Sequence, residues 1–165
     1  MSTATKISLL LAAITSGLTA GLFWGYAYSV MRAMRTVDDK IFVTVMIKIN
    51  IVIQNGWFGF CFGGGLVFAV VSVIMVLVSR NVAALPWAIA SAVLFLAAVV
   101  VTSVINIPLN NALATVAATA DPDTLAAARE RFEAPWNRAN VIRAALHTAA
   151  FVAACLALLA DRVRP

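Results

Sequence analysis

The amino-acid sequence predicts an all-α integral membrane protein: a four-helix bundle whose helices span the membrane, with short interfacial helices in the first and third connections. Two observations predict this class. Of the 165 residues, 63% are hydrophobic and only 12% are charged, which is far from the balance of a soluble domain. Long uncharged runs alternate with short polar segments, and each run supplies the roughly 20 residues that a helix needs to cross a hydrocarbon core.

No linker or low-complexity tract divides the chain, so we expect a single membrane domain over residues 1–165. The spans are expected at about 7–31, 56–79, 86–107 and 135–160. The net charge of +5 comes from Lys and Arg residues scattered between apolar runs, without a basic stripe interleaved with aromatic residues. Anionic lipid headgroups are therefore the expected partner, and nucleic acid is not.

The first span, residues 7–31, is too long for the apolar part of a signal peptide and is interpreted as an uncleaved anchor. Its spaced glycines favour close packing inside the bundle or, as the alternative, a homodimer seam: Gly17, Gly21 and Gly25. Tyr28 lies near its end, where it suits the interface belt or faces a cavity.

The first connection is predicted to hold an interfacial amphipathic helix that begins at Asp38 and Asp39. It is too polar to span comfortably, and its apolar residues keep roughly helical spacing: Ile41, Val45, Ile49 and Val52. Lys48 and Asn50 either reach lipid headgroups or enter a site.

The middle of the chain supplies spans two and three. Gly63-Gly64-Gly65 in span two predicts close helix packing, because no Lys-Ser/Thr pair follows to make a phosphate loop. Span three starts at Pro86-Trp87 and ends at an amide-rich segment, Asn106-Ile107-Pro108-Leu109-Asn110-Asn111. Pro108 frees backbone carbonyls, and the amides need polar neighbours from other helices. A short surface helix is then expected from Pro122 to Glu133.

Polar residues in the first half of span four share one helix face, because they fall at spacings of i, i+4, i+7 and i+11: Trp136, Asn140, Arg143 and His147. Arg143 lies roughly 12 Å from the start of the helix, and an ionisable residue at that depth faces the bundle interior or water with a partner. The first and third connections lie on the same side of four spans. The amphipathic segment of the first connection, the amide cluster and the polar start of span four are therefore expected together on that side. Their meeting point is the candidate site.

This constellation supports anion chemistry. Arg143 is suited to stabilise an enolate or phenolate, the asparagines to orient a carbonyl or hydroxyl, and His147 to act as a base. In the alternative interpretation, Arg143 pairs with carbonyls freed by Pro108 or with Glu133, and His147 only forms hydrogen bonds inside the bundle. No metal site is expected, because both cysteines lie in apolar runs and the chain has a single His.

The chain resembles the anthrone-oxygenase-like family of small four-span membrane proteins. The resemblance is carried by Gly21-Leu22-Phe23, Ile49-Asn50, Asn106-Ile107-Pro108-Leu109-Asn110-Asn111-Ala112-Leu113 and the segment from Trp136 to Arg143. It implies oxidation of an anthrone to an anthraquinone with dioxygen and without metal or flavin, with Asn106, Asn110, Asn140 and Arg143 at the matched positions. One departure is that family members often have Trp-Asn-His-x-Arg where this chain has Ala139-Asn140-Val141-Ile142-Arg143.

The sequence therefore leaves two functional hypotheses. The first is a membrane-embedded, cofactor-independent oxygenase-like protein, an anthrone-oxygenase-type monooxygenase acting with dioxygen on a lipophilic aromatic or quinol-like substrate. The second is a non-catalytic membrane protein that binds a lipophile or packs as a subunit of a larger assembly, and a homo-oligomer is possible in either case. The expected catalytic residues are Arg143, His147 and Asn140, and the expected substrate-binding residues are Asn106, Asn110, Trp136 and Tyr28.

We expect the protein in a bacterial cell membrane with both termini on the same side. Four spans place the termini together, and the cytoplasmic side is the working assignment. The positive-inside rule does not decide this orientation, because Lys and Arg are nearly balanced between the two sides.

Overall fold

The computed structural model describes residues 1–116 and 119–160, and every regular element in these ranges is helical. The elements in chain order, with η for a π-helical segment, are α1 (Thr3–Gly25), η1 (Tyr26–Val30), α2 (Met31–Met34), α3 (Asp39–Val52), α4 (Gly56–Phe58), η2 (Gly59–Gly63), α5 (Gly64–Val78), α6 (Leu85–Val101), η3 (Thr102–Asn106), α7 (Ile107–Ala114) and α8 (Pro122–Leu159). The predicted all-α class is confirmed.

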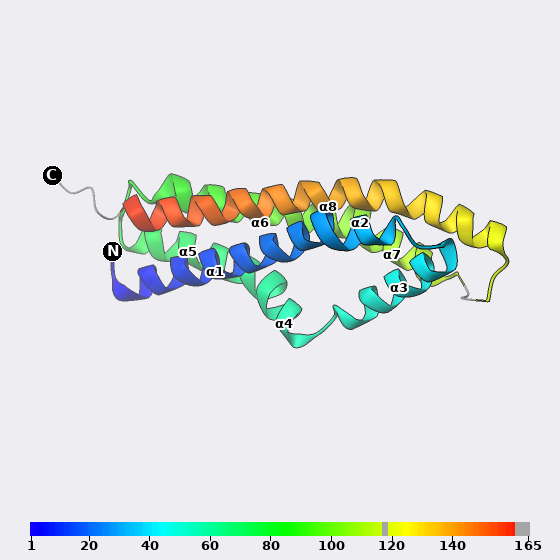
Figure 1. Cartoon of the computed structure of the whole chain (residues 1–165). Coiled ribbons are helices and arrows are strands. Elements are labelled where there is room, and N and C mark those ends of the chain that lie inside the picture. The colour runs from blue at the N-terminus through cyan, green and yellow to red at the C-terminus, as the bar shows by residue number, and fades with distance from the viewer. Residues whose placement is uncertain (117–118, 161–165) are drawn as a thin grey trace.

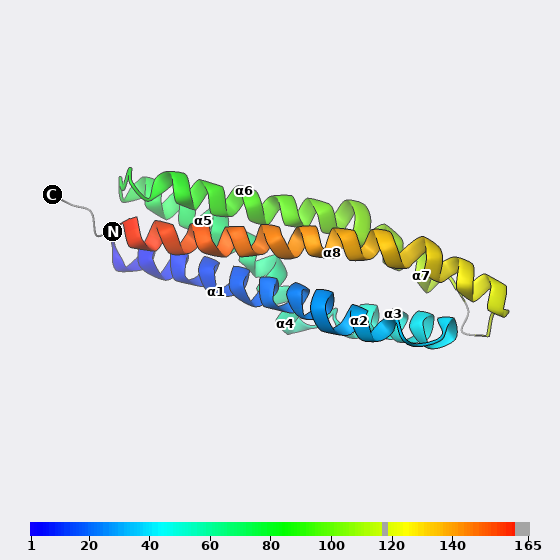
Figure 2. The same ribbon diagram turned by 45° about the horizontal axis from the view of Figure 1, so that its top comes forward.

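Four stretches of continuous helix in the described residues are long and apolar enough to cross a membrane: Thr3–Met34, Gly56–Val78, Leu85–Ala114 and Pro122–Leu159. They run alongside one another in both ribbon views (Figure 1, Figure 2), and the last turns of α8 return to the end of the bundle where the N-terminus lies. The protein is therefore an integral membrane protein whose first and last helical turns share one end of the bundle.

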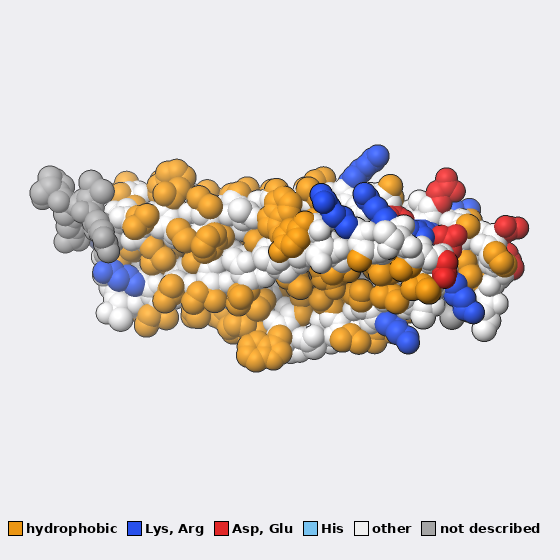
Figure 3. Space-filling view, viewed as in Figure 1, with side chains coloured by type: hydrophobic (Ala, Val, Ile, Leu, Met, Phe, Trp, Pro, Cys, Tyr) orange, Lys and Arg blue, Asp and Glu red, His pale blue; other side chains and the backbone are white. Residues whose placement is uncertain are grey.

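Charge divides the bundle along its length. Figure 3 shows apolar side chains over the half of this face nearer the termini, whereas most of the acidic and basic side chains on it gather over the other half. The apolar half suits hydrocarbon, because it exposes large apolar side chains. Val67, Ile74 and Val78, for example, are 57%, 52% and 73% exposed. The charged half contains α2, α3 and the beginning of α8, so it belongs beyond the hydrocarbon region.

Aromatic rings pack directly against glycines between the spans. A Cβ atom added to Gly65 would lie 2.5 Å from Cζ of Phe95, so the Phe95 ring occupies the space that any side chain on Gly65 would need. Gly17 receives the Phe151 ring in the same way, at 3.3 Å. Gly21 and Gly25 have no atom within 4 Å of such a position, so the expected close packing of the spaced glycines on α1 is limited to Gly17.

The predicted helix in the first connection is present as α3, and Asp38 caps it by accepting a 2.7 Å hydrogen bond from the backbone N–H of Ile41. The face that it packs against the bundle is not the apolar face named from the sequence. The fully buried residues are Phe42, Val43 and Met46, which join the cluster around Phe132, Trp136 and Leu113. Ile41 and Val52, which were expected on the apolar face, are 46% and 71% exposed.

The third connection contains no separate helix in its described residues. The segment expected from Pro122 to Glu133 forms the first turns of α8, which continues through Pro135 as one helix of 38 residues. Pro135 removes one backbone donor, but the carbonyl that it leaves belongs to Arg131 on an exposed part of the helix, where water can satisfy it. Span three also continues past residue 107, because α7 carries Pro108 in its first turn.

Candidate functional site

The polar stripe predicted on span four points into the bundle. Trp136, Asn140, Arg143 and His147 are 3%, 0%, 6% and 0% exposed. They lie on the face of α8 that packs against α1, α6 and η3. The helical spacing therefore gives the arrangement that was expected from the sequence.

Arg143 is a buried cation without a carboxylate partner in the described part of the chain. Its Nε and Nη2 donate hydrogen bonds of 3.3 and 3.0 Å to Oδ1 of Asn140. The guanidinium carbon lies 3.9 Å from the centre of the Phe23 ring and 5.1 Å from that of Trp136. These rings supply cation–π contact in place of an ion pair.

Glu133, the carboxylate considered as an alternative partner for Arg143, is engaged elsewhere. It pairs with Arg129 at 2.8 Å and with Arg35 at 3.5 Å. No ion pair involving Arg143 occurs within residues 1–116 and 119–160. The guanidinium therefore keeps donors available for a ligand.

Spans three and four meet through their amide groups. Asn106, fully buried, donates from Nδ2 to the carbonyl oxygen of Trp136 at 3.3 Å. Nε1 of Trp136 in turn donates to Oδ1 of Asn110 at 2.8 Å. Asn140 ties the same region to span one, because its Nδ2 donates to the carbonyl oxygen of Phe23 at 2.9 Å. The bond to Phe23 fixes the orientation of Asn140, whose Oδ1 holds the Arg143 guanidinium.

A pocket of about 450 Å³ lies against this polar region. Its lining combines aromatic and aliphatic side chains with amides, a phenol and the guanidinium: Phe23, Tyr26, Ile49, Asn50, Ile53, Gln54, Phe58, Phe62, Thr102, Ile107, Asn110, Asn111, Trp136 and Arg143. A mostly apolar concavity with a few convergent polar groups is the usual form of a small-molecule site.

The three π-helical segments each contribute a lining residue from a different span: Tyr26 in η1, Phe62 in η2 and Thr102 in η3. A π turn interrupts the regular helical register and is frequent at functional sites. The positions of these side chains follow from the local irregularity of the helices, which the helical spacing of the sequence does not reveal.

The structure brings most of the predicted site residues together. Asn110, Trp136 and Arg143 line the pocket, while Asn140 and Asn106 lie directly behind it and bond to those residues. The lining does not include Tyr28, whose side chain is 63% exposed, but it does include Tyr26, two positions earlier. Both tyrosines belong to the π-helical segment η1, and only Tyr26 is turned toward the pocket.

Asn50, for which the sequence left open either a site or the lipid headgroups, lines the pocket, and sequence reasoning missed the contributions of Gln54, Phe58 and Phe62. The spacing of four between Asn50 and Gln54 was the available signal for Gln54, since it places both amides on one side of α3. For Phe58 and Phe62, which stack with ring centres 5.1 Å apart, the same spacing was available.

His147 lies behind the pocket wall. Its ring is surrounded by Phe23, Phe62 and Phe95, with ring centres 5.5, 5.9 and 4.4 Å away. Neither ring nitrogen has a hydrogen-bond partner in the described residues. Phe23 and Phe62 line the pocket and His147 does not, so its role as a base stays a prediction.

Position 141, where the family often carries an imidazole, faces away from this site. Val141 is 43% exposed and does not line the pocket. The absence of an imidazole at position 141 therefore leaves the lining of this pocket unchanged, whereas Ala139, at the position of the pattern's Trp, is buried on α8. The described residues also contain no group of three or more His, Cys, Asp or Glu side chains placed to hold a metal ion.

The fold and the pocket define a class: an integral membrane helical bundle with a buried guanidinium and amide site between its spans. The sequence pattern of the family described as Anthrone oxygenase matches residues 57–153, which is more than half of the chain. The protein therefore belongs to the anthrone oxygenase family. The match includes the amide cluster of span three and the polar stripe of α8. No curated protein and no solved structure matches the chain.

Proposed function

We propose that this protein is a membrane-embedded, cofactor-independent oxygenase-like enzyme that oxidises a lipophilic aromatic or quinol-like substrate with dioxygen. The observation that carries the proposal is Arg143, a buried guanidinium that lines a pocket and has no carboxylate partner in the described residues. Membership of the anthrone oxygenase family supports an oxygenase-like role.

The unpaired guanidinium favours a ligand that carries or develops negative charge. Nη1 of Arg143 has no hydrogen-bond partner in the described residues, and Asn140 orients the rest of the group. In a site largely shielded from water, such a preoriented donor stabilises an oxyanion far more than it would in bulk solvent. An enolate or phenolate oxygen fits this environment.

The remaining walls suit a flat, apolar body. Phe23, Phe58 and Phe62 present aromatic rings to the pocket, and Trp136 adds an indole held in place by Asn110. Aromatic side chains contribute large apolar contact areas and favour offset or edge-to-face contacts with other rings. The site therefore combines ring contacts with an anion-binding group that lies against two of those rings.

In the proposed reaction, a base removes a proton from a C–H group activated by a carbonyl to which it is conjugated through the aromatic rings, and Arg143 holds the oxygen of the resulting delocalised anion. The carbanion donates electrons to dioxygen and forms a carbon–oxygen bond, which gives a hydroperoxide after protonation. Loss of water then leaves a carbonyl, so one substrate CH₂ and one O₂ yield C=O and H₂O. His147 is the proposed base, and Phe23 or Phe62 must move aside when the substrate binds for it to act.

The proposal is tested by incubating the purified protein with an anthrone under air and under anaerobic conditions. The expected result is oxygen consumption and quinone formation by the wild type under air, with large losses in Arg143→Ala and Arg143→Lys. Arg138→Ala is the matched control, because Arg138 is an exposed arginine on the same helix. Equal turnover by wild type and Arg143→Ala would overturn the proposal.

The burial of His147 behind the pocket wall favours a second candidate, a lipophile-binding protein without catalytic activity. In that case the anthrone binds in the pocket and is protected from oxidation. Ligand binding that depends on Arg143, together with oxygen consumption no faster than in buffer, would support this candidate over the oxygenase.

A further inference from the structure

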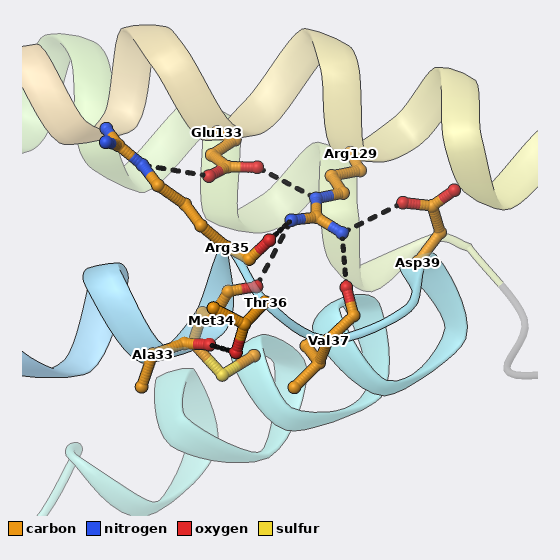
Figure 4. Close-up of polar contacts among 8 residues, drawn as sticks. All are labelled: Ala33, Met34, Arg35, Thr36, Val37, Asp39, Arg129 and Glu133. Atoms are coloured by element: carbon orange, nitrogen blue, oxygen red, sulfur yellow. Dashed lines mark hydrogen bonds and ion pairs between the residues drawn. The ribbon is translucent and has the colours of Figure 1, made fainter.

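Arg129, on α8 and outside the pocket lining, uses all of its hydrogen-bond donors. A guanidinium carries five N–H groups, and Arg129 makes five hydrogen bonds with the first connection and with its own helix (Figure 4). The acceptors are Glu133 Oε2 at 2.8 Å, the carbonyl oxygens of Val37, Met34 and Arg35 at 2.8, 3.1 and 3.4 Å, and Asp39 Oδ1 at 3.0 Å.

These acceptors lie at the end of one helix and the start of the next. The carbonyls of Met34 and Arg35 lie at the C-terminal end of α2, where backbone carbonyls have no partner within the helix. Asp39 is the first residue of α3, and Val37 lies between the two helices. A single side chain on α8 therefore holds both the end of span one and the beginning of α3.

The Arg129–Glu133 pair in this cluster is largely shielded from solvent, whereas the Asp39 side chain is 41% exposed. The side chains of Arg129 and Glu133 are only 15% and 19% exposed, so their pairing is screened less than a pair at the surface. The guanidinium carbon of Arg129 also lies 4.5 Å from the centre of the Phe42 ring, and Phe42 is fully buried on α3. The attachment of α3 to α8 thus combines hydrogen bonds, charge and ring contact.

The contact continues toward the pocket through aromatic rings. Phe42 of α3 packs edge-on against Phe132 with ring centres 6.1 Å apart. Phe132 stacks on Trp136 at 5.8 Å, and Trp136 lines the pocket. The anchored half of α3 is therefore in direct packing contact with the α8 wall of the pocket.

The other end of α3 forms the opposite wall, where Ile47 and Ile49 pack against the buried cluster but no hydrogen bond or ion pair joins α3 to α8 in the described residues. Ile49, Asn50, Ile53 and Gln54 line the pocket. The side-chain amide of Gln54 donates only to the carbonyl oxygen of Asn50, within α3 itself, at 2.9 Å. Ile51 is 66% exposed, and the helix ends at Val52. The polar contacts that set the position of this wall are thus those made by Arg129 at the other end of the helix.

We propose that Arg129 is a positioning residue for the pocket: it fixes the angle of α3 against α8 and thereby the width of the ligand site. The proposal rests on the pocket being the site of the proposed function. Lysine cannot replace Arg129 here, because an ammonium carries three donors on one atom and cannot reach acceptors spread over two helix ends.

The test measures the distance between α3 and α8 by electron paramagnetic resonance of spin labels in the full-length protein in lipid nanodiscs. The labels are attached at Lys48→Cys and Arg138→Cys, both exposed positions, after replacement of Cys61 and Cys155. We expect one narrow distance distribution in the otherwise wild-type chain. Arg129→Lys and Arg129→Gln should broaden it and shift it to longer distances.

Two controls separate repositioning from unfolding. Arg131→Gln removes an exposed arginine of the same helix and should leave the α3–α8 distribution unchanged. A second label pair at Val93→Cys and Val152→Cys reports on α6 and α8 and should be unchanged in every variant. If Arg129→Gln does not fold, Arg129→Lys and Asp39→Asn carry the test. A wild-type α3–α8 distribution in Arg129→Lys would overturn the proposal.

Activity measurements keep this proposal distinct from the proposed function. If the wild type turns over an anthrone, Arg129→Lys should raise KM more than it lowers kcat. The substitution disturbs ligand binding but leaves the contact between Arg143 and the oxyanion in place. If wild type shows no turnover, the proposed function fails while a shifted α3–α8 distance still supports the positioning role. If Arg129→Lys keeps both the wild-type α3–α8 distance and normal turnover, the positioning role is overturned and the proposed function stands.

Discussion

Nε1 of Trp136 donates a 2.8 Å hydrogen bond to Oδ1 of Asn110, and this bond joins the fourth span to the third at the wall of the pocket. The carbonyl oxygen of Trp136 also accepts from Nδ2 of Asn106. One tryptophan is thus held from both its backbone and its side chain. The two spans that carry the guanidinium and the amides cannot shift relative to one another without breaking these bonds.

Replacing either partner of the Trp136–Asn110 hydrogen bond should lower the stability of the protein. The two losses should not add up in the double variant. Asn110→Leu leaves the indole N–H without its partner, and Trp136→Phe removes the donor. Each should destabilise the protein by about 1 kcal/mol, a typical size for an interhelical hydrogen bond in a membrane protein. Unfolding titrations of both single variants and of the double variant measure this. Fully additive losses would show that the two side chains are not coupled.

Gly65 should not tolerate a side chain unless Phe95 is made smaller. Gly65→Ala places a Cβ atom 2.5 Å from the Phe95 ring, so the ring and the His147 packed on it must move. We expect a clear drop in thermal stability in detergent, with partial recovery in Gly65→Ala combined with Phe95→Leu. Gly21→Ala is the matched control, because no atom lies within 4 Å of the added Cβ. An equal effect of both glycine substitutions would contradict the prediction.

The sequence predicted the parts of the site that follow from regular helical geometry. Span positions come from apolar length, and the stripe from Trp136 to His147 comes from helical spacing, which α8 keeps without interruption. The junction of spans three and four was predictable from buried amides that need partners. These features depend on local sequence and on the requirement that polar groups in a membrane be satisfied.

Other features depend on tertiary contacts or on irregular turns. Tyr26 lies in the pocket and Tyr28 does not, and both lie in the π-helical segment η1, where helical spacing cannot be extrapolated. Glu133 pairs with Arg129 at a spacing of i,i+4 on α8, which helical geometry predicts, whereas only the position of the first connection brings Arg35 to the same carboxylate. The apolar spacing of α3 did not identify the residues that pack inside the protein, because Phe42 and Met46 pack against α8, a contact that the periodicity of α3 alone does not specify.

His147 should be replaceable by an apolar residue without loss of the fold. Its two ring nitrogens are buried and have no partner in the described residues, and a buried polar group without a partner costs about 1 to 3 kcal/mol. His147→Leu should therefore unfold at a higher temperature than wild type. If His147 is also the base, the same variant loses turnover while it still binds ligand. A lower melting temperature in His147→Leu would mean that the imidazole has a partner in the folded protein.

Substitutions of Arg143 should affect the stability of the protein and its ligand binding in different ways. A buried cation without an ion pair is costly to keep in a membrane protein, so Arg143→Leu, which retains apolar contact with Phe23, should be at least as stable as wild type. The same substitution removes the group that holds an oxyanion, so an anthrone should bind more weakly to it. Thermal unfolding and equilibrium binding of the anthrone under anaerobic conditions measure the two effects separately. Arg143→Lys tests geometry against charge, because an ammonium at this position cannot keep both bonds to Oδ1 of Asn140 and face the pocket.

Weaker ligand binding in Arg143→Leu together with undiminished stability indicates a group retained for function. A large loss of stability with unchanged binding would instead make Arg143 a structural residue of the bundle.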